Sequence, residues 1–298
     1  MDQATPDQTT PDRAFRLDDP TPADPRRRWA SLDPDARDAC YDNTRAVADS
    51  AQRVAARDAA SAAYRAAHPR GLDRPYGPGA RNAVDLYPAR DAAAPCLVFL
   101  HGGYWQRGAR ELFACFAEGP NAAGWSVAMV GYTLAPEAGL TRIAAEIDAA
   151  LDWLAAQGPG HGIRGPLVLS GWSAGGLLAA LRLGHSAVAA GLAISGVYDL
   201  APIRQTTLNA KLALTDAEIE TLSPLRLPVC AKPLCIAYGT AELPALIHDA
   251  RNLHALRAAA HAPGPLLPVP GAEHFSVLDA LRRPDGILVR AAHALLGG

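Results

Sequence analysis

One pentapeptide constrains this chain more than any other feature. The sequence GWSAG occupies residues 171–175, follows the apolar run 167–170 and precedes a stretch with helical character at 176–181. A G-x-S-x-G motif between a buried strand and a helix forms a tight turn that lifts the serine hydroxyl out of the sheet edge. Glycine on each side keeps bulky side chains out of that turn. The motif therefore predicts that Ser173 is a nucleophile.

A second motif lies upstream, where the apolar run 95–100 leads directly into HGGYW at residues 101–105. A glycine pair that follows a buried strand lets the backbone approach a bound molecule with no side chain in the way. Loops of the HGG type supply backbone N–H donors to an oxygen that becomes negatively charged during acyl transfer. We therefore expect this loop to lie beside Ser173.

Strands and helices alternate along most of the chain. Apolar runs predict strands at 82–88, 97–100, 126–130, 167–170, 192–195, 234–238 and 266–269. Helical spacing predicts helices within 33–67 and at 111–117, 142–156, 176–183, 244–260, 276–281 and 286–296. This alternation predicts an α/β fold with a mostly parallel sheet covered by helices on both faces. The rhythm is interrupted at about 198–232, where we expect a small lid.

Length and charge limit the organisation and the partners. A chain of 298 residues is long enough for one domain with a large core, which we place at 31–298. Residues 1–30 are rich in Asp, Pro, Thr and Gln and predict a disordered tail. The net charge of −2 gives no basic excess, so nucleic acid is not an expected partner. We expect a small-molecule substrate, and a homodimer is left open.

The compartment and the cofactors are also expectations from composition. The five cysteines are scattered and odd in number, which favours a reducing, cytoplasmic setting over a disulfide framework. No run of about 18 apolar residues and no signal-peptide core is present, so we expect no membrane span and no secretory leader. The nine histidines show no spacing typical of metal ligands. We expect neither a metal nor another cofactor.

A serine nucleophile needs a base, and the base needs an acid that orients it. The histidines after the motif are His185, His248, His254, His261, His274 and His293. Only His274 lies in a loop after a late strand, whereas the others fall on or at the ends of predicted helices. His274 is therefore the predicted base.

Two carboxylates compete for the role of the acid. Glu242 is the only carboxylate in the turn 239–244, which follows the predicted strand 234–238. Asp199 follows the preceding strand and is the alternative. We predict Glu242, and Asp199 stays open.

With HGGYW, GWSAGG and GAEHFSVLDAL established, the chain resembles the kynurenine formamidase (arylformamidase) branch of the α/β-hydrolase superfamily. Segments around 41–43, 76–79, 131–137 and 198–204 are also similar to this branch, so the resemblance runs from about residue 33 to the C-terminus. It implies the α/β-hydrolase fold.

The resemblance also implies a role for each site residue. Ser173 would be the nucleophile, His274 the base and Glu242 the acid, although many relatives have Asp at that position. The backbone N–H groups of Gly102, Gly103 and Ala174 would form the oxyanion hole.

Three aromatic residues flank the nucleophile and the glycine loop. Tyr104, Trp105 and Trp172 would suit an aromatic leaving group by stacking, and core packing is the alternative. The resemblance implies hydrolysis of N-formylkynurenine or a similar aryl formamide. A carboxylesterase of small acyl esters and a catalytically silent ligand-binding member of the fold are the alternatives.

Overall fold

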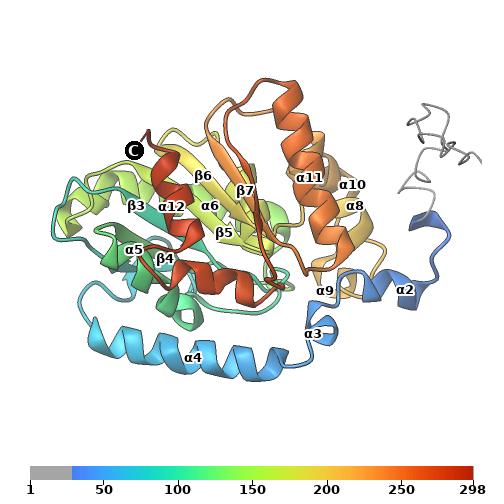
Figure 1. Ribbon diagram of the computed structural model, residues 1–298, viewed down its shortest axis with the longest axis horizontal. Helices are drawn as coiled ribbons and strands as arrows, with labels where there is room; N and C mark the ends of the chain where they lie inside the picture. Colours follow the sequence, from blue (N-terminus) through green and yellow to red (C-terminus); the bar gives the residue numbers. More distant parts are fainter. Residues whose placement is uncertain (1–28, 298) are drawn as a thin grey trace, which may run out of the picture.

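The computed structural model describes residues 29–297 of the chain. One eight-stranded sheet with the order β1-β2-β4-β3-β5-β6-β7-β8 forms its centre (Figure 1). From β4 to β8 the paired strands are parallel, whereas β2 is antiparallel to both β1 and β4. The strands are β1 (Arg74–Pro75), β2 (Ala83–Tyr87), β3 (Cys96–Leu100), β4 (Ser126–Val130), β5 (Leu167–Trp172), β6 (Val188–Ile194), β7 (Leu234–Gly239) and β8 (Leu266–Val269).

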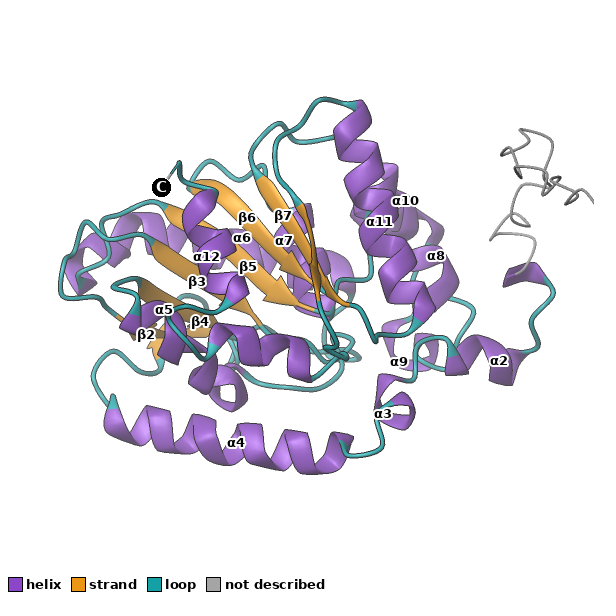
Figure 2. Ribbon diagram, in the orientation of Figure 1, coloured by secondary structure: helices purple, strands orange, loops and turns teal. Residues whose placement is uncertain are grey.

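Helices flank this sheet (Figure 2). The α-helices are α2 (Pro34–Ala39), α3 (Asn43–Ala46), α4 (Ser50–Ala67), α5 (Glu118–Ala122), α6 (Leu140–Gln157), α7 (Ala174–Leu181), α8 (Leu200–Ile203), α9 (Asn209–Leu212), α10 (Asp216–Leu222), α11 (Pro244–Ala259) and α12 (Ile287–Ala294). The 3-10 helices are η1 (Arg110–Ala117), η2 (Gly158–His161), η3 (Pro224–Arg226) and η4 (Ser276–Leu281).

Strand β3 shows why helices cover both faces of the sheet. Successive side chains of a strand point to opposite faces, so a strand that is buried at every residue needs a layer on each side. Cys96, Val98 and Leu100 join the hydrophobic cluster that contains α6, α7 and α11. Leu97 and Phe99 join the cluster that contains η1, η4 and α12. The predicted α/β fold with helices on both faces is confirmed.

Some predicted elements differ from the observed ones. The helical region predicted within 33–67 is divided into α2, α3 and α4, and the side chain of Asp42 caps α3 by accepting from the Arg45 N–H at 2.9 Å. The helices predicted at 111–117 and 276–281 are 3-10 helices. Residues 1–28 of the predicted tail lie outside the described residues. Trp29, at the end of that predicted tail, packs edge-on against Tyr41 with ring centroids 5.9 Å apart.

The segment 198–232, predicted as a lid, forms the short helices α8, α9, α10 and η3, and η3 packs against α11. Its apolar side chains are buried in the same hydrophobic cluster as α6 and α11. They include Leu200, Ile203, Leu212, Ile219 and Leu222. The segment is therefore packed into the core on the flank of the sheet.

The long helix α4 is fixed to the antiparallel side of the sheet by a buried carboxylate. Asp85 of β2 is fully buried, and it forms ion pairs with Arg65 of α4 and, at 3.1 Å, with Arg110 of η1. The backbone N–H of Asp73 donates to the same carboxylate at 2.8 Å. Because a buried carboxylate is stable only when it is paired and hydrogen-bonded, these contacts hold α4 in a defined position. The N-terminal half of α4 then lies over the carboxyl ends of the strands.

Two further properties hold for the part of the chain between residues 29 and 297. None of its helices is long and apolar enough to cross a membrane. It contains no group of three or more His, Cys, Asp or Glu side chains placed to hold a metal ion.

Candidate active site

Ser173 lies in the turn between β5 and α7 in a strained backbone conformation. Its φ of 56° and ψ of −117° are unusual for a residue with a side chain. A Cβ atom on Gly171 would lie 2.1 Å from the Gly175 carbonyl oxygen, and one on Gly175 would lie 2.0 Å from the Leu100 carbonyl oxygen. Only glycine fits at either position, so the tight turn predicted from the motif is present.

His274 lies next to this serine. It follows β8 in an irregular loop, and its Nε2 atom is 3.1 Å from Ser173 Oγ. The indole N–H of Trp172 donates to the His274 carbonyl oxygen at 2.9 Å, and the two rings are 4.7 Å apart. Trp172 therefore fixes both the backbone and the ring of His274. The structure brings together the predicted nucleophile and the predicted base.

Glu242 follows β7 and faces the other side of the His274 ring. Its Oε2 atom is 3.7 Å from His274 Nδ1, which is longer than a hydrogen bond. Both atoms are buried, and neither has another partner among residues 29–297. The Oε1 atom accepts from the Ser195 hydroxyl and, at 3.1 Å, from the Gly239 N–H. The carboxylate is thus anchored through one oxygen while the other faces the imidazole.

Asp199, the alternative acid, is engaged elsewhere. Its carboxylate caps α8 by accepting from the Ala201 N–H at 3.0 Å, and it forms an ion pair with Arg226 at 3.0 Å. Within residues 29–297, the Asp199 carboxylate forms no hydrogen bond and no ion pair with His274. Of the two carboxylates that the sequence left open, the structure places Glu242 beside the histidine.

Ser195 is a site residue that the sequence analysis missed. It follows β6, is fully buried and has a φ of 52°. Its hydroxyl is the side-chain donor that holds Glu242. The available signal was a polar residue at the end of the otherwise apolar run 192–195, at the sheet edge where Ser173 lies.

Three backbone N–H groups near Ser173 are free to donate. The N–H groups of Gly102, Gly103 and Ala174 have no acceptor among the described residues. Gly103 has a φ of +119°, and Ala174 is the first residue of α7. Gly102 has a packing role, since a Cβ atom there would lie 2.5 Å from the Trp172 ring. A developing negative charge near Ser173 Oγ would meet these donors and the positive end of the α7 dipole.

His101 anchors the glycine loop as a neutral ring. Its Nδ1 atom is 2.8 Å from the Gly102 carbonyl oxygen, which can only accept, so Nδ1 carries the proton. The ring stacks on Tyr132 with centroids 4.3 Å apart and lies parallel to Phe113. Burial lowers the pKa of His101 to about 4.

A cavity of about 370 Å³ opens beside Ser173, a size suited to a small organic molecule. Gly102, Gly103, Trp172 and His274 form part of its wall. The opposite wall comes from α3, α4 and the turn between them, within residues 43–58. None of the lining residues belongs to the segment 198–232. The segment predicted as a lid therefore does not cover this cavity, because its apolar side chains are buried against α6 and α11.

The three aromatic residues predicted to bind substrate have different positions. Tyr104 and Trp172 line the cavity. The Tyr104 hydroxyl donates to the Tyr41 carbonyl at 2.7 Å and accepts from Asn43 Nδ2 at 3.1 Å, which ties the cavity wall to the N-terminal segment. Trp105 is fully buried in the hydrophobic core and lines no part of the cavity. For Trp105 the prediction of substrate stacking is wrong, and the core-packing alternative holds.

Comparison with known proteins is consistent with this arrangement. A family model described as an alpha/beta hydrolase fold matches residues 97–257. A kynurenine formamidase from Salmo salar is 26% identical over 243 residues, which cover 76% of this chain and 82% of that protein. A kynurenine formamidase from Danio rerio is 23% identical over 242 residues, with the same coverage.

Solved structures share the same fold. A protein from Silicibacter sp. TM1040 described as a candidate thioesterase is 28% identical, has a TM-score of 0.75, and the match covers 86% of this chain and 98% of that one. An esterase from Mycobacterium marinum has a TM-score of 0.68 at 21% identity, and the match covers 84% of this chain and 90% of that one.

The neutral state of His101 gives a testable pH dependence. Unfolding takes up a proton between the folded pKa of about 4 and the ordinary value of 6.5, so this group destabilises the fold as the pH falls through that window. Between pH 7 and pH 5 the native protein should lose about 2 kcal/mol more of its free energy of unfolding than His101→Phe, which keeps the stacked ring. Urea unfolding at both pH values measures the difference.

Asp249 has the opposite effect on stability. Burial raises its pKa to about 7, so this carboxyl group stabilises the fold as the pH falls. It is present in both proteins, so its effect cancels in the comparison. An equal loss of stability in the native protein and in His101→Phe would show that His101 is not held neutral.

Proposed function

Because this chain belongs to the α/β hydrolase family and is a hydrolase, we propose that it cleaves the formamide of N-formylkynurenine or a similar aryl formamide with Ser173, His274 and Glu242. The observation that carries the proposal is the 3.1 Å contact between Ser173 Oγ and His274 Nε2 at a strained turn flanked by free N–H donors. The similarity to kynurenine formamidases supports the choice of a formamide.

The reaction begins when Ser173 Oγ attacks the formyl carbon and His274 Nε2 takes the hydroxyl proton. The carbonyl oxygen becomes negative and accepts hydrogen bonds from the N–H groups of Gly103 and Ala174, which strengthen as the charge develops. His274 then gives its proton to the aryl nitrogen, the C–N bond breaks, and the free amine leaves. Water, deprotonated by His274, attacks the formyl carbon of the Ser173 ester. The bond between that carbon and Ser173 Oγ then breaks, His274 returns the proton to Ser173 Oγ, and formic acid leaves and ionises to formate.

Glu242 stabilises the imidazolium that exists between these proton transfers. The protonated His274 ring has an Nδ1–H that needs an acceptor, and Glu242 Oε2 is a buried carboxylate oxygen without another partner. Their separation of 3.7 Å is compatible with this role, because catalytic hydrogen bonds are often long in an unliganded enzyme. Ser195 positions the carboxylate from the other oxygen.

A small acyl ester is the second candidate substrate. The same three side chains would hydrolyse it by the same steps, and a cavity of about 370 Å³ has room for an acyl group larger than formyl. A silent ligand-binding protein has no need for a serine in hydrogen-bond contact with a histidine, so the contact favours the two catalytic alternatives.

The choice between substrates is tested by comparing kcat/KM for N-formylkynurenine with that for p-nitrophenyl acetate. We expect a higher value for the formamide even though its leaving group is poorer, because the site would position the proton donor for an aryl nitrogen. Ser173→Ala is the control and should be inactive on both. A protein that hydrolyses the ester and leaves the formamide intact is a carboxylesterase.

The identity of the acid is tested by comparing Glu242→Gln with Asp199→Asn. The neutral amide cannot stabilise the imidazolium, so Glu242→Gln should lower kcat by about 10³-fold to 10⁴-fold. Asp199→Asn should stay within about threefold of the native value, because a single pair with an exposed arginine contributes little. Circular dichroism verifies that both variants are folded, and the reverse ranking would make Asp199 the acid.

A further inference from the structure

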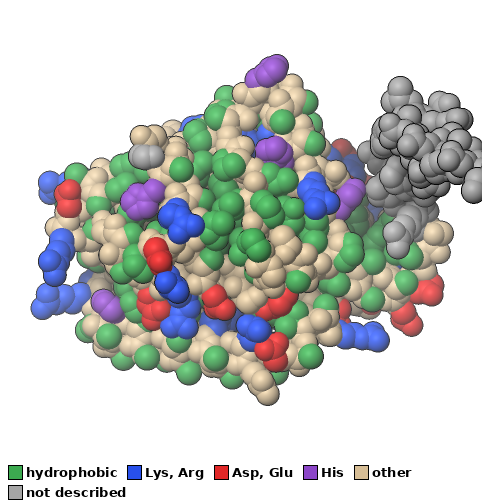
Figure 3. Space-filling model, viewed as in Figure 1, with side chains coloured by type: hydrophobic (Ala, Val, Ile, Leu, Met, Phe, Trp, Pro, Cys, Tyr) green, Lys and Arg blue, Asp and Glu red, His purple; other side chains and the backbone are tan. Residues whose placement is uncertain are grey.

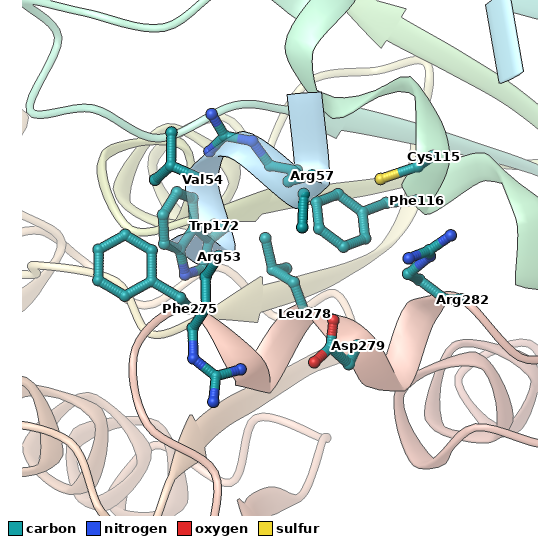
Figure 4. A pocket seen from close by; sticks show the side chains of 11 residues that line it. Arg53, Val54, Arg57, Cys115, Phe116, Trp172, Phe275, Leu278, Asp279 and Arg282 are labelled. Atoms are coloured by element: carbon teal, nitrogen blue, oxygen red, sulfur yellow. The ribbon is translucent and has the colours of Figure 1, made fainter. Parts of the chain in front are cut away.

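A second cavity of about 250 Å³ adjoins the one beside Ser173 (Figure 4). The two cavities share the wall residues Val54, Arg57, Trp172 and Phe275. The second cavity lies between α4, η1 and η4. These four residues therefore lie between the two spaces, and a substrate that filled both would have to pass them.

The shared wall places the second cavity on the leaving-group side of the site. Trp172 lies with its ring 4.7 Å from that of His274, and Phe275 follows His274 in the chain. In the proposed reaction, on which this step rests, His274 gives its proton to the leaving amine. The amine and its substituents must then lie next to His274, at the entrance to the second cavity.

The walls of this cavity combine apolar surface with charge. Val54, Phe116 and Leu278 supply apolar surface near the shared aromatic rings. Figure 4 shows Arg57 and Asp279 on opposite sides of Leu278 and Phe116. Basic and acidic side chains also appear on the surface around α4 and η4 (Figure 3). The cavity thus suits a group that is apolar along its length and charged at its end.

The three arginines of the cavity are already paired with carboxylates. The pairs are Arg53 with Asp49 at 3.0 Å and with Glu273 at 3.3 Å, Arg57 with Asp58 at 2.7 Å, and Arg282 with Glu118 at 2.9 Å. When these four carboxylate partners are counted, carboxylates outnumber the three guanidinium groups around the cavity. A bound anion would have to compete with these partners.

Asp279 differs from the other charged residues of the cavity. Its side chain forms no hydrogen bond and no ion pair with any residue in the range 29–297, although Arg53 and Arg282 are close enough to interact with it electrostatically. It belongs to η4 and lines the cavity near its exposed edge. A cation that entered past Leu278 would meet an unpaired carboxylate.

We propose that the second cavity binds the remote end of the leaving group and that Asp279 recognises an ammonium group there. The preferred substrates are then aryl formamides or aryl esters whose aromatic part carries an aliphatic ammonium. N-formylkynurenine meets this requirement, because its side chain has an ammonium group as well as a carboxylate. Asp279 is a specificity residue that takes no part in the bond-breaking steps.

Substrate analogues and a charge-neutral variant together test the proposal. The substrates are N-formylkynurenine, its analogue with hydrogen in place of the ammonium, and its analogue with hydrogen in place of the carboxylate. For the native protein, kcat/KM should fall about tenfold without the ammonium and about twofold or less without the carboxylate. In Asp279→Asn the preference for the ammonium substrate should disappear, mainly through KM. Asp35→Asn, at an exposed position of α2, is the matched control and should keep the native preference.

Two results would overturn the proposal: no loss when the ammonium is removed, or a preference for the ammonium that survives in Asp279→Asn. A protein that hydrolyses none of the three formamides contradicts the proposed function instead. Three phenyl acetates whose rings carry the side chains of these three formamides then test the cavity separately. Their hydrolysis does not depend on formamide cleavage. Equal kcat/KM for the three esters would also overturn the proposal.

Discussion

The site depends on the close packing of the turn after β5 against the end of β3. Gly175 lies so near the Leu100 carbonyl oxygen that no side chain fits between them. This contact holds Ser173 in its strained conformation and brings the glycine loop that follows Leu100 to the same place. Ser173 and the free N–H of Gly103 are therefore positioned by one backbone contact. A rigid, buried sheet maintains the strain, as is common at functional sites.

The N-terminal helices complete the site from outside the sheet. Asp85 pairs with Arg65 and Arg110 and so fixes α4, while Asn43 and Tyr104 join α3 to the glycine loop. These contacts place the wall of both cavities opposite His274. The shape of the site is thus determined by a segment that is far from Ser173 in the sequence. Substitutions in α3 and α4 are the natural way to change which molecules fit, without changing Ser173, His274 or Glu242.

Local patterns in the sequence were sufficient to predict the parallel sheet, the turn at Ser173 and the nearby His274. Each depends on features within a few residues: continuous apolar strands, glycines on both sides of a serine, and a histidine in a late loop. Ser195 could not be predicted in the same way, because its role depends on Glu242, which approaches it only in the folded chain. The same is true of Trp105, whose burial depends on packing that its neighbours in sequence do not reveal.

The central claim is that Ser173 is made nucleophilic by His274. Labelling with a fluorophosphonate, followed by intact-mass measurement and peptide mapping, tests it most directly, because this reagent reacts with serines activated by a base. We predict a single adduct on Ser173 in the native protein, and much slower labelling of a folded His274→Ala variant. No adduct on Ser173, or equal labelling rates in the two proteins, would contradict it.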